Sequence, residues 1–200
     1  PEPNDTVLEM CASPGSKTTQ MAMMMKNTGV IVANDKDNMR LKPLVANLQR
    51  CGVINSIVTL NDSRFINKNF SKILLDAPCS SSGTLRGYSQ KNVKTALTWK
   101  PNLIKSVAGM QRKLLMKAYE ILNPKGTLVY STCSIDPEED ESIIQFLLDN
   151  TNAKLQKIPL KIKSEVNLEY NGIKFSSELK NCIKLWPQFY NTEGFFIAKI

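Results

Sequence analysis

The sequence has no histidine among its 200 residues. A Ser-His-Asp triad or a Cys-His pair therefore cannot form within this chain, and a proton acceptor must be another side chain or water. No two cysteines have the C-x-x-C spacing. Because zinc sites built from cysteine and histidine lack their ligands here, no metal is predicted. The five cysteines are Cys11, Cys51, Cys79, Cys133 and Cys182.

Long apolar runs are also lacking, and none approaches the roughly 20 residues that a membrane-spanning helix needs. No membrane partner is therefore expected. The polar start of the chain, Pro1-Glu-Pro-Asn-Asp5, does not have the pattern of a signal peptide and has no Met. An odd number of cysteines without such a signal indicates reduced thiols and an intracellular protein. Because the first predicted strand follows almost at once, we expect a fragment that lacks an N-terminal segment.

Negative charge is in the minority, with 18 Asp and Glu against 26 Lys and Arg, which gives a net charge of +8. This excess fits either a soluble basic surface or a polyanionic partner, and charge alone does not decide between them. With 42% hydrophobic residues, the chain can bury the core of one domain, which we expect to span residues 1–200. A monomer is expected.

Predicted strands and helices alternate along the chain. The patterns predict strands at 6–10, 29–35, 56–60, 72–76 and 127–131. They predict helices at 16–26, with Ser16 as its cap, and at 37–50, 101–122 and 136–150. Edge strands are predicted at 153–158 and 194–199. This alternation predicts an α/β fold with a doubly wound, mainly parallel, Rossmann-like sheet and an antiparallel C-terminal edge.

Two cysteines directly follow predicted strands. Cys79 ends the motif Asp76-Ala-Pro-Cys79, and Cys133 lies in Ser131-Thr-Cys-Ser134. If the two strands are neighbours in a parallel sheet, both thiols lie at its carboxyl edge, where open α/β sheets bind ligands. Taken alone, a free cysteine is more often a small buried apolar residue, and Cys51, Cys182 and the Cys11 side chain are expected to be of this kind. Together beside a ligand loop, the two thiols indicate covalent chemistry.

A glycine-containing turn follows the first predicted strand, and carboxylates follow the next three. The turn Cys11-Ala-Ser-Pro-Gly-Ser-Lys17 precedes a helix, so its N–H groups can face a polar ligand, although it has no dinucleotide or P-loop spacing. Asp35 can accept hydrogen bonds from a ribose and Asp62 from an adenine amino group, while Asp76 ends the fourth strand. Three carboxylates disfavour phosphates. They favour the adenosine-containing, cationic S-adenosylmethionine.

Six ordered motifs of this chain resemble those of the RNA cytosine-5 methyltransferases of the NSUN or RsmB-like family. They are Leu8–Gln20, Ala33-Asn-Asp35, Leu74–Ser80, Tyr130–Ser134, Pro137–Glu141 and Gly194–Lys199. The resemblance covers nearly the whole chain, and residues 25–35 resemble especially the nucleolar rRNA branch as well as archaeal relatives. It implies a class I S-adenosylmethionine-dependent methyltransferase that forms 5-methylcytosine in rRNA or tRNA. A nuclear or nucleolar location would follow in a eukaryote, and a cytoplasmic one otherwise.

The resemblance also implies roles for individual residues. Cys133 would be the nucleophile that adds to C6 of cytosine, Cys79 would help to release the product, and Asp76 would lie where cofactor and cytosine meet. The cofactor would be held by the residues Cys11, Ala12, Ser13, Pro14, Gly15, Ser16, Lys17, Asp35, Arg40, Asp62 and Asp76. No metal takes part.

The chain departs from the family at one position near Cys79. A glycine usually follows the Cys-Ser pair, whereas Ser80-Ser-Ser82 stands here before Gly83. We expect this change to stiffen or shift the turn. A loop at 77–100 either contacts RNA through its basic and aromatic residues Arg86, Tyr88, Lys91, Lys94, Trp99 and Lys100, or is a solvated loop with a buried Trp99. The alternative function is an RNA-binding ribosome-assembly factor that keeps the fold while catalysis is secondary.

Overall fold

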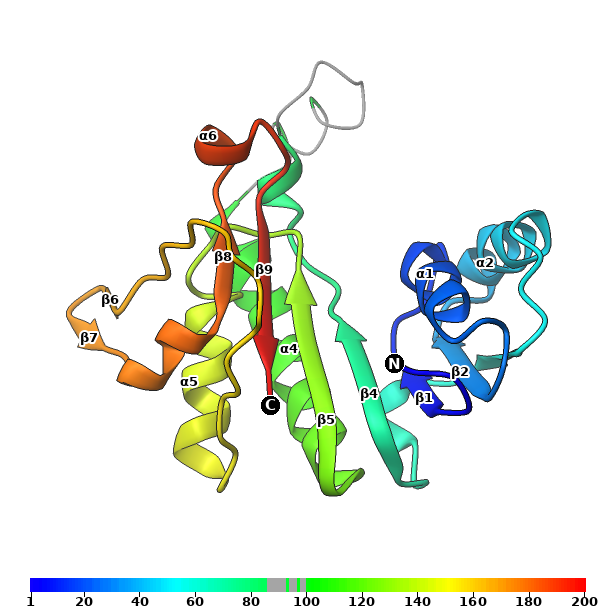
Figure 1. The fold of residues 1–200 in the computed structure, drawn as a ribbon. Helices are drawn as coiled ribbons and strands as arrows, with labels where there is room; N and C mark the ends of the chain where they lie inside the picture. The colour runs from blue at the N-terminus through cyan, green and yellow to red at the C-terminus, as the bar shows by residue number, and fades with distance from the viewer. Residues whose placement is uncertain (86–92, 94–96, 98–99) are drawn as a thin grey trace. The chain divides into compact units, whose positions relative to one another are not determined.

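The computed structural model describes residues 1–85, 93, 97 and 100–200. The chain divides into two compact units, which are described separately (Figure 1). The first comprises Pro1–Asp76 and Met116–Leu128, and the second comprises Ala77–Leu115 and Val129–Ile200.

The central element is a seven-stranded sheet with the hydrogen-bonded order β3-β2-β1-β4-β5-β9-β8. Strands β1, β2, β3 and β4 pair in parallel, whereas β9 pairs antiparallel with both β5 and β8. The α/β class and the antiparallel C-terminal edge predicted from the sequence are therefore confirmed. The strands are β1 (Thr6–Glu9), β2 (Val30–Asp35), β3 (Ser56–Leu60), β4 (Phe70–Asp76), β5 (Leu122–Thr132), β8 (Ile183–Leu185) and β9 (Phe195–Lys199).

The first unit adds two helices, α1 (Ser16–Met24) and α2 (Asn38–Arg50), and the 3-10 helix η1 (Ser63–Phe65) to β1–β4. Apolar side chains of β1 and β2 pack against one face of α1. Met21 and Met25 are buried in this contact, whereas Met23 is 72% exposed. A second cluster joins Ala33 to leucines of α2. This packing fixes the ends of β1 and β2, which carry the predicted cofactor residues.

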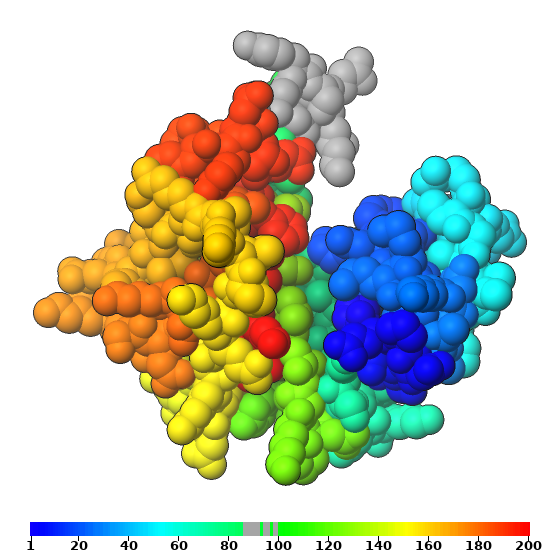
Figure 2. Space-filling model, viewed as in Figure 1, coloured from blue at the N-terminus to red at the C-terminus, as the bar shows by residue number. Residues whose placement is uncertain are grey.

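The second unit contains the carboxyl-terminal end of β5 and the strands β8 and β9, with β9 between the other two. Its helices include α5 (Glu141–Asn150) and α6 (Pro187–Tyr190), and two short 3-10 helices, η2 (Ser82–Thr84) and η3 (Ser177–Asn181). A two-stranded hairpin, β6 (Glu169–Tyr170) and β7 (Ile173–Lys174), protrudes from this unit (Figures 1 and 2). Helix α4 (Pro101–Glu120) contributes residues to both units.

Three sequence-based predictions of local structure were wrong. The helix predicted from residue 136 begins at Glu141, because side chains and backbone of the preceding acidic turn make tertiary hydrogen bonds. Residues 153–158 form no strand; this segment is held by single bonds, such as Gln156 N–H to the Lys199 carbonyl. The N-cap of α1 is Gly15, not Ser16. None of the helices in the described part of the chain is long and apolar enough to cross a membrane.

Candidate functional site

The loop after β1 leads into the first turn of α1. Gly15 has φ +102 and caps the helix without a side-chain hydrogen bond. A Cβ on Gly15 would lie 2.9 Å from Leu44 Cδ1, so both the backbone conformation and the space favour glycine. The first turn of α1 therefore presents backbone N–H groups that no side chain caps, which is the arrangement that binds polar or anionic ligand groups.

The carboxylate of Asp35 lies beside this loop, at the end of β2. Its oxygens accept hydrogen bonds from the N–H groups of Ser13 (3.2 Å) and Asp37 (3.1 Å). The Arg40 guanidinium lies 3.6 Å from the same carboxylate and donates to the Ser13 carbonyl. The Asp35 side chain is only 3% exposed, whereas the Arg40 side chain beside it is 46% exposed.

The other two predicted acidic residues are also paired with cations. Arg64 makes bidentate hydrogen bonds to Asp62 and lowers the pKa of that carboxyl to about 2. The Lys17 ammonium donates to Asp76 at 2.6 Å. Each of the three carboxylates in the first unit thus has a basic neighbour. Because these cations offset the negative charge, the three carboxylates repel phosphate less than their sequence positions predict.

Glu9, at the end of β1, is a buried acid that the sequence reasoning did not consider. It is 1% exposed and accepts a hydrogen bond from the Thr18 hydroxyl at 2.5 Å. Burial raises its pKa from 4.5 to about 7, although the Thr18 bond opposes this shift. Between pH 4.5 and 7 the folded protein therefore keeps a proton on Glu9 that the unfolded chain has released. The stability that comes from protonated Glu9 is fully present below pH 4.5 and is lost as the pH rises to 7.

We expect Glu9→Gln to remove this pH dependence, because glutamine stays neutral and keeps an oxygen for Thr18. Relative to the variant, the wild type should lose up to about 3 kcal/mol between pH 4.5 and pH 8, or several degrees in Tm. Thermal unfolding followed by circular dichroism over this pH range measures the difference. Glu193→Gln, at an exposed position, is the control. Parallel curves for wild type and Glu9→Gln would contradict this assignment.

Three cysteines lie outside the predicted catalytic pair. Burial raises the pKa of Cys11 to about 12, so its thiol stays neutral and its contribution to the loop is made by the backbone. Cys182 is buried, 3% exposed, as expected for a small apolar residue. The same expectation was wrong for Cys51, which is exposed as the residue that ends α2.

The two predicted catalytic cysteines are in contact in the second unit. The sulfur of Cys79, in the segment after β4, lies 2.9 Å from that of Cys133, which directly follows β5. The hydrogen bond to Cys133, followed by burial, raises the pKa of Cys79 far above the usual value of a thiol. The Cys79 thiol therefore stays protonated, and either sulfur can be the donor in its contact with the other.

Backbone hydrogen bonds hold the two cysteine segments against each other. The Ala77 N–H donates to the Ser131 carbonyl at 2.9 Å, and the Gly83 N–H donates to the Cys133 carbonyl at 3.0 Å. The Gly83 carbonyl in turn accepts from Gly194 N–H. A Cβ on Gly83 would lie 2.7 Å from the Cys133 oxygen, so only glycine allows this approach.

The carboxylate of Glu139 joins the residues that directly follow the two cysteines. Its Oε2 accepts from the Ser80 N–H at 2.9 Å, and its Oε1 accepts from the Ser134 hydroxyl at 3.2 Å. Gln111 of α4 donates from one nitrogen to both Glu139 Oε2 and the Pro78 carbonyl. Glu139 is fully buried. This single carboxylate therefore fixes the spacing of the two thiol-bearing segments.

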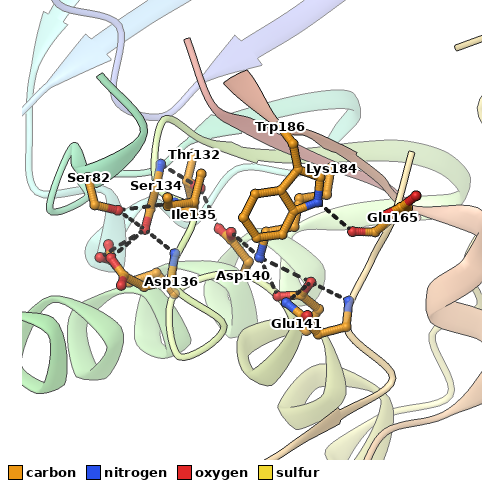
Figure 3. Close-up of polar contacts among 12 residues, drawn as sticks. Ser82, Thr132, Ser134, Ile135, Asp136, Asp140, Glu141, Glu165, Lys184 and Trp186 are labelled. Carbon is orange, nitrogen blue, oxygen red and sulfur yellow. Dashed lines mark hydrogen bonds and ion pairs between the residues drawn. The ribbon is translucent and has the colours of Figure 1, made fainter. Parts of the chain in front are cut away.

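A buried group of charged side chains lies beside Thr132 and Ser134, the two residues that flank Cys133 (Figure 3). The Lys184 ammonium of β8 lies 3.1 Å from Asp140 Oδ2 and 2.9 Å from Glu141 Oε2, and all three side chains are 0% exposed. Asp140 Oδ1 accepts from the Thr132 hydroxyl at 2.6 Å, and that hydroxyl accepts from the Ser134 N–H at 3.3 Å. Burial raises the pKa of Asp140, and Lys184 opposes this shift.

Five residues predicted to contact RNA, Arg86, Tyr88, Lys91, Lys94 and Trp99, lie outside the described residues; Lys100 is exposed. Within the described ranges, no group of three or more His, Cys, Asp or Glu side chains could hold a metal ion.

The α/β fold, with a mostly parallel seven-stranded sheet and antiparallel edge strands, matches class I methyltransferase structures. The chain belongs to the family described as 16S rRNA methyltransferase RsmB/F, whose model matches residues 1–200. The family resemblance inferred from the six motifs is thereby confirmed.

Three similar proteins illustrate this membership. The tRNA (cytosine(49)-C(5))-methyltransferase of Pyrococcus abyssi is 46% identical over 100% of this chain and 64% of its own length. A methyltransferase homologue from Pyrococcus horikoshii has a TM-score of 0.85 and 44% identity, covering 100% of this chain and 62% of that one. NSun6 from Pyrococcus horikoshii, determined with SFG, has a TM-score of 0.83 and 32% identity, covering 100% and 48%. The chain therefore spans less than two thirds of each.

The sequence analysis did not identify three residues of the second unit as members of the site. Glu139 was assigned to the first turn of a helix, although the run of acids that contains it was noticed. Ser81 was noticed only as a departure in a serine run. Lys184 lies 43 positions from Glu141, to which its ammonium donates, and no local sequence pattern links the two residues.

Proposed function

We propose that this chain is the catalytic domain of an S-adenosylmethionine-dependent RNA methyltransferase that acts on C5 of cytosine. The observation that carries the proposal is the contact of Cys79 and Cys133, with sulfur atoms 2.9 Å apart. Methylation at C5 requires a nucleophile on C6 and a second group that assists its departure. Two thiols in contact supply both without histidine or metal.

S-adenosylmethionine fits the residues of the first unit. The uncapped start of α1 suits the polar methionine part, and the buried Asp35 carboxylate, with Arg40 beside it, suits ribose hydroxyls. Asp62 takes the adenine side, and the loop of residues 11–17 wraps the methionine part. When bound, this cofactor supplies an electrophilic methyl group on a sulfonium centre. The relative NSun6, determined with SFG, supports a ligand of this kind.

Cys133 acts as the nucleophile. Its thiolate forms a bond to C6 of cytosine, and the electron pair of the C5–C6 double bond makes C5 nucleophilic. After C5 has taken the methyl group and left S-adenosylhomocysteine, water takes the C5 proton. The C5–H electron pair forms the C5–C6 double bond again as the C6–sulfur bond breaks. Cys133 then departs as a thiolate.

Cys79 assists the release. Its raised pKa keeps a proton on this thiol, from which it can donate to the departing Cys133 sulfur. Asp76, three positions before Cys79, is the residue proposed to bind N3 of the cytosine. That role needs a proton on Asp76, so the Lys17–Asp76 ion pair must open when the base binds.

The substrate is RNA in which the target cytosine is single-stranded or flipped out of the stack, because a base inside a helix does not expose C6 to a thiol. The net charge of +8 favours binding of the phosphate backbone. The family description concerns rRNA and the Pyrococcus abyssi relative is named for tRNA, so both are assayed as substrates.

The test is methyl transfer by the full-length protein to RNA from cells that lack its gene. Nucleosides from the digested RNA are separated, and 5-methylcytidine is quantified by mass spectrometry; sequencing then assigns it to tRNA or rRNA. We expect 5-methylcytidine that depends on both the protein and S-adenosylmethionine. Methyl groups on another nucleoside would contradict the proposal. Full rescue of a deletion strain by Cys133→Ala would instead favour the assembly-factor function.

A further inference from the structure

Ser81 has a backbone conformation that serine rarely adopts. Its φ is +62 and its ψ is 25, in the left-handed region that glycine populates readily and that costs other residues roughly 1 kcal/mol or more. A side chain kept in such a conformation beside a reactive site is an indication of function.

The side chain of Ser81 lies against the two thiols. Its hydroxyl oxygen is 3.5 Å from the Cys133 sulfur, which donates to it, and 4.0 Å from the Cys79 sulfur. All three residues belong to the second unit. The hydroxyl therefore touches the sulfur that is proposed to react.

The Ser81 backbone is held from both sides. Its carbonyl accepts from the Thr84 N–H at 3.0 Å and from the Thr84 hydroxyl at 2.9 Å, which closes the turn of η2. The neighbouring Ser80 is anchored by Glu139, and Ser82 bonds to the Ile135 N–H. These contacts fix the direction of the Ser81 Cα–Cβ bond, and in the structure the hydroxyl lies near both sulfur atoms.

We propose that Ser81 is a third member of the thiol site, whose hydroxyl donates a hydrogen bond to the Cys133 sulfur when that sulfur is ionised. In the neutral site Cys133 donates to Ser81. When the Cys133 proton passes to water, the Ser81 hydroxyl rotates and becomes the donor, because a hydroxyl can act as either. A hydrogen bond to the charged form favours ionisation of Cys133. The inference rests on the proposed role of Cys133 as nucleophile.

The test measures Cys133 ionisation without RNA or S-adenosylmethionine, so failure of the proposed enzymatic function would not affect it. The purified protein is treated with iodoacetamide at a series of pH values, and peptide mass spectrometry gives the alkylation rate of Cys133 separately from other cysteines. Ser81→Gly and Ser81→Ala are compared with wild type. The alanine variant removes only the hydroxyl, whereas the glycine variant also relieves the backbone.

In both variants we expect the pH midpoint of Cys133 alkylation to rise by about one unit, with alkylation near pH 7 slowed roughly tenfold, since a hydrogen bond to a charged group is lost. Asn171→Gly relieves a left-handed residue, φ +51, in the β6–β7 turn and should leave the midpoint unchanged. An unchanged midpoint in both Ser81 variants would overturn the proposal, even if Ser81→Gly raised Tm. A shift in Ser81→Gly alone would also overturn it, because the backbone and not the hydroxyl would be responsible.

Discussion

Replacing Cys133 by alanine should lower methyl transfer to cytosine at least about 10³-fold, to the background of the assay. Without a sulfur bond at C6, C5 of cytosine stays a poor nucleophile, and binding of both substrates cannot compensate. The measurement is single-turnover formation of 5-methylcytidine in the RNA that the full-length protein modifies.

The Cys133 variant needs controls that separate chemistry from folding and binding. Its affinity for S-adenosylmethionine, measured by calorimetry, should stay within about twofold, because the residues proposed to hold the cofactor belong to the first unit. Cys51→Ala, at an exposed thiol that ends α2, should keep wild-type activity. If Cys133→Ala retained more than a tenth of the wild-type rate, Cys133 would not be the nucleophile.

Replacing Lys184 by methionine should lower the free energy of unfolding by about 3–5 kcal/mol. The change leaves the carboxylates of Asp140 and Glu141, both fully buried, without their ammonium partner. Tm should fall by roughly 10 °C in a chain of this length. Lys180→Met, at an exposed lysine of η3, is the matched control and should change stability by less than about 0.5 kcal/mol.

Two further results distinguish a charge effect from a packing effect at Lys184. Adding Asp140→Asn to Lys184→Met should restore part of the lost stability, because one uncompensated charge is removed while an oxygen remains for Thr132. Acidification should also stabilise the Lys184→Met protein relative to wild type. Burial raises the pKa of Asp140. As the pH falls, the folded protein therefore binds a proton at Asp140 before the unfolded chain does, and this proton binding stabilises the folded state. Equal losses at all pH values would indicate packing alone.

The sequence was most informative where strands end. Cys79, Cys133 and Asp35 were assigned to the ends of strands because β-like runs precede them, and neighbouring parallel strands bring such ends together. The first five predicted strands are all present, and the two sulfur atoms are in contact. Short strands such as β8, three residues long, were missed because so few residues give no alternation of buried and exposed side chains.

Pairings between distant residues were beyond local patterns. The acids of residues 136–141 were interpreted as the favourable first turn of a helix, which is their usual role. In the structure Glu141 does lie in the first turn of α5 and also accepts from Lys184, whereas Glu139 precedes the helix and accepts from Ser80. Only the tertiary fold brings these partners near. The conformation of Ser81 was not predicted either, because residues other than glycine rarely adopt positive φ.

The central claim is that Cys133 bonds to the base and that Cys79 is needed to release it. The most direct measurement is mass spectrometry of Cys79→Ala after incubation with S-adenosylmethionine and the RNA that the wild type methylates. We expect a protein–RNA adduct that survives denaturation and maps by peptide analysis to Cys133, and none with the Cys79→Ala/Cys133→Ala double variant. Free turnover by Cys79→Ala, or an adduct on any other residue, would contradict this account.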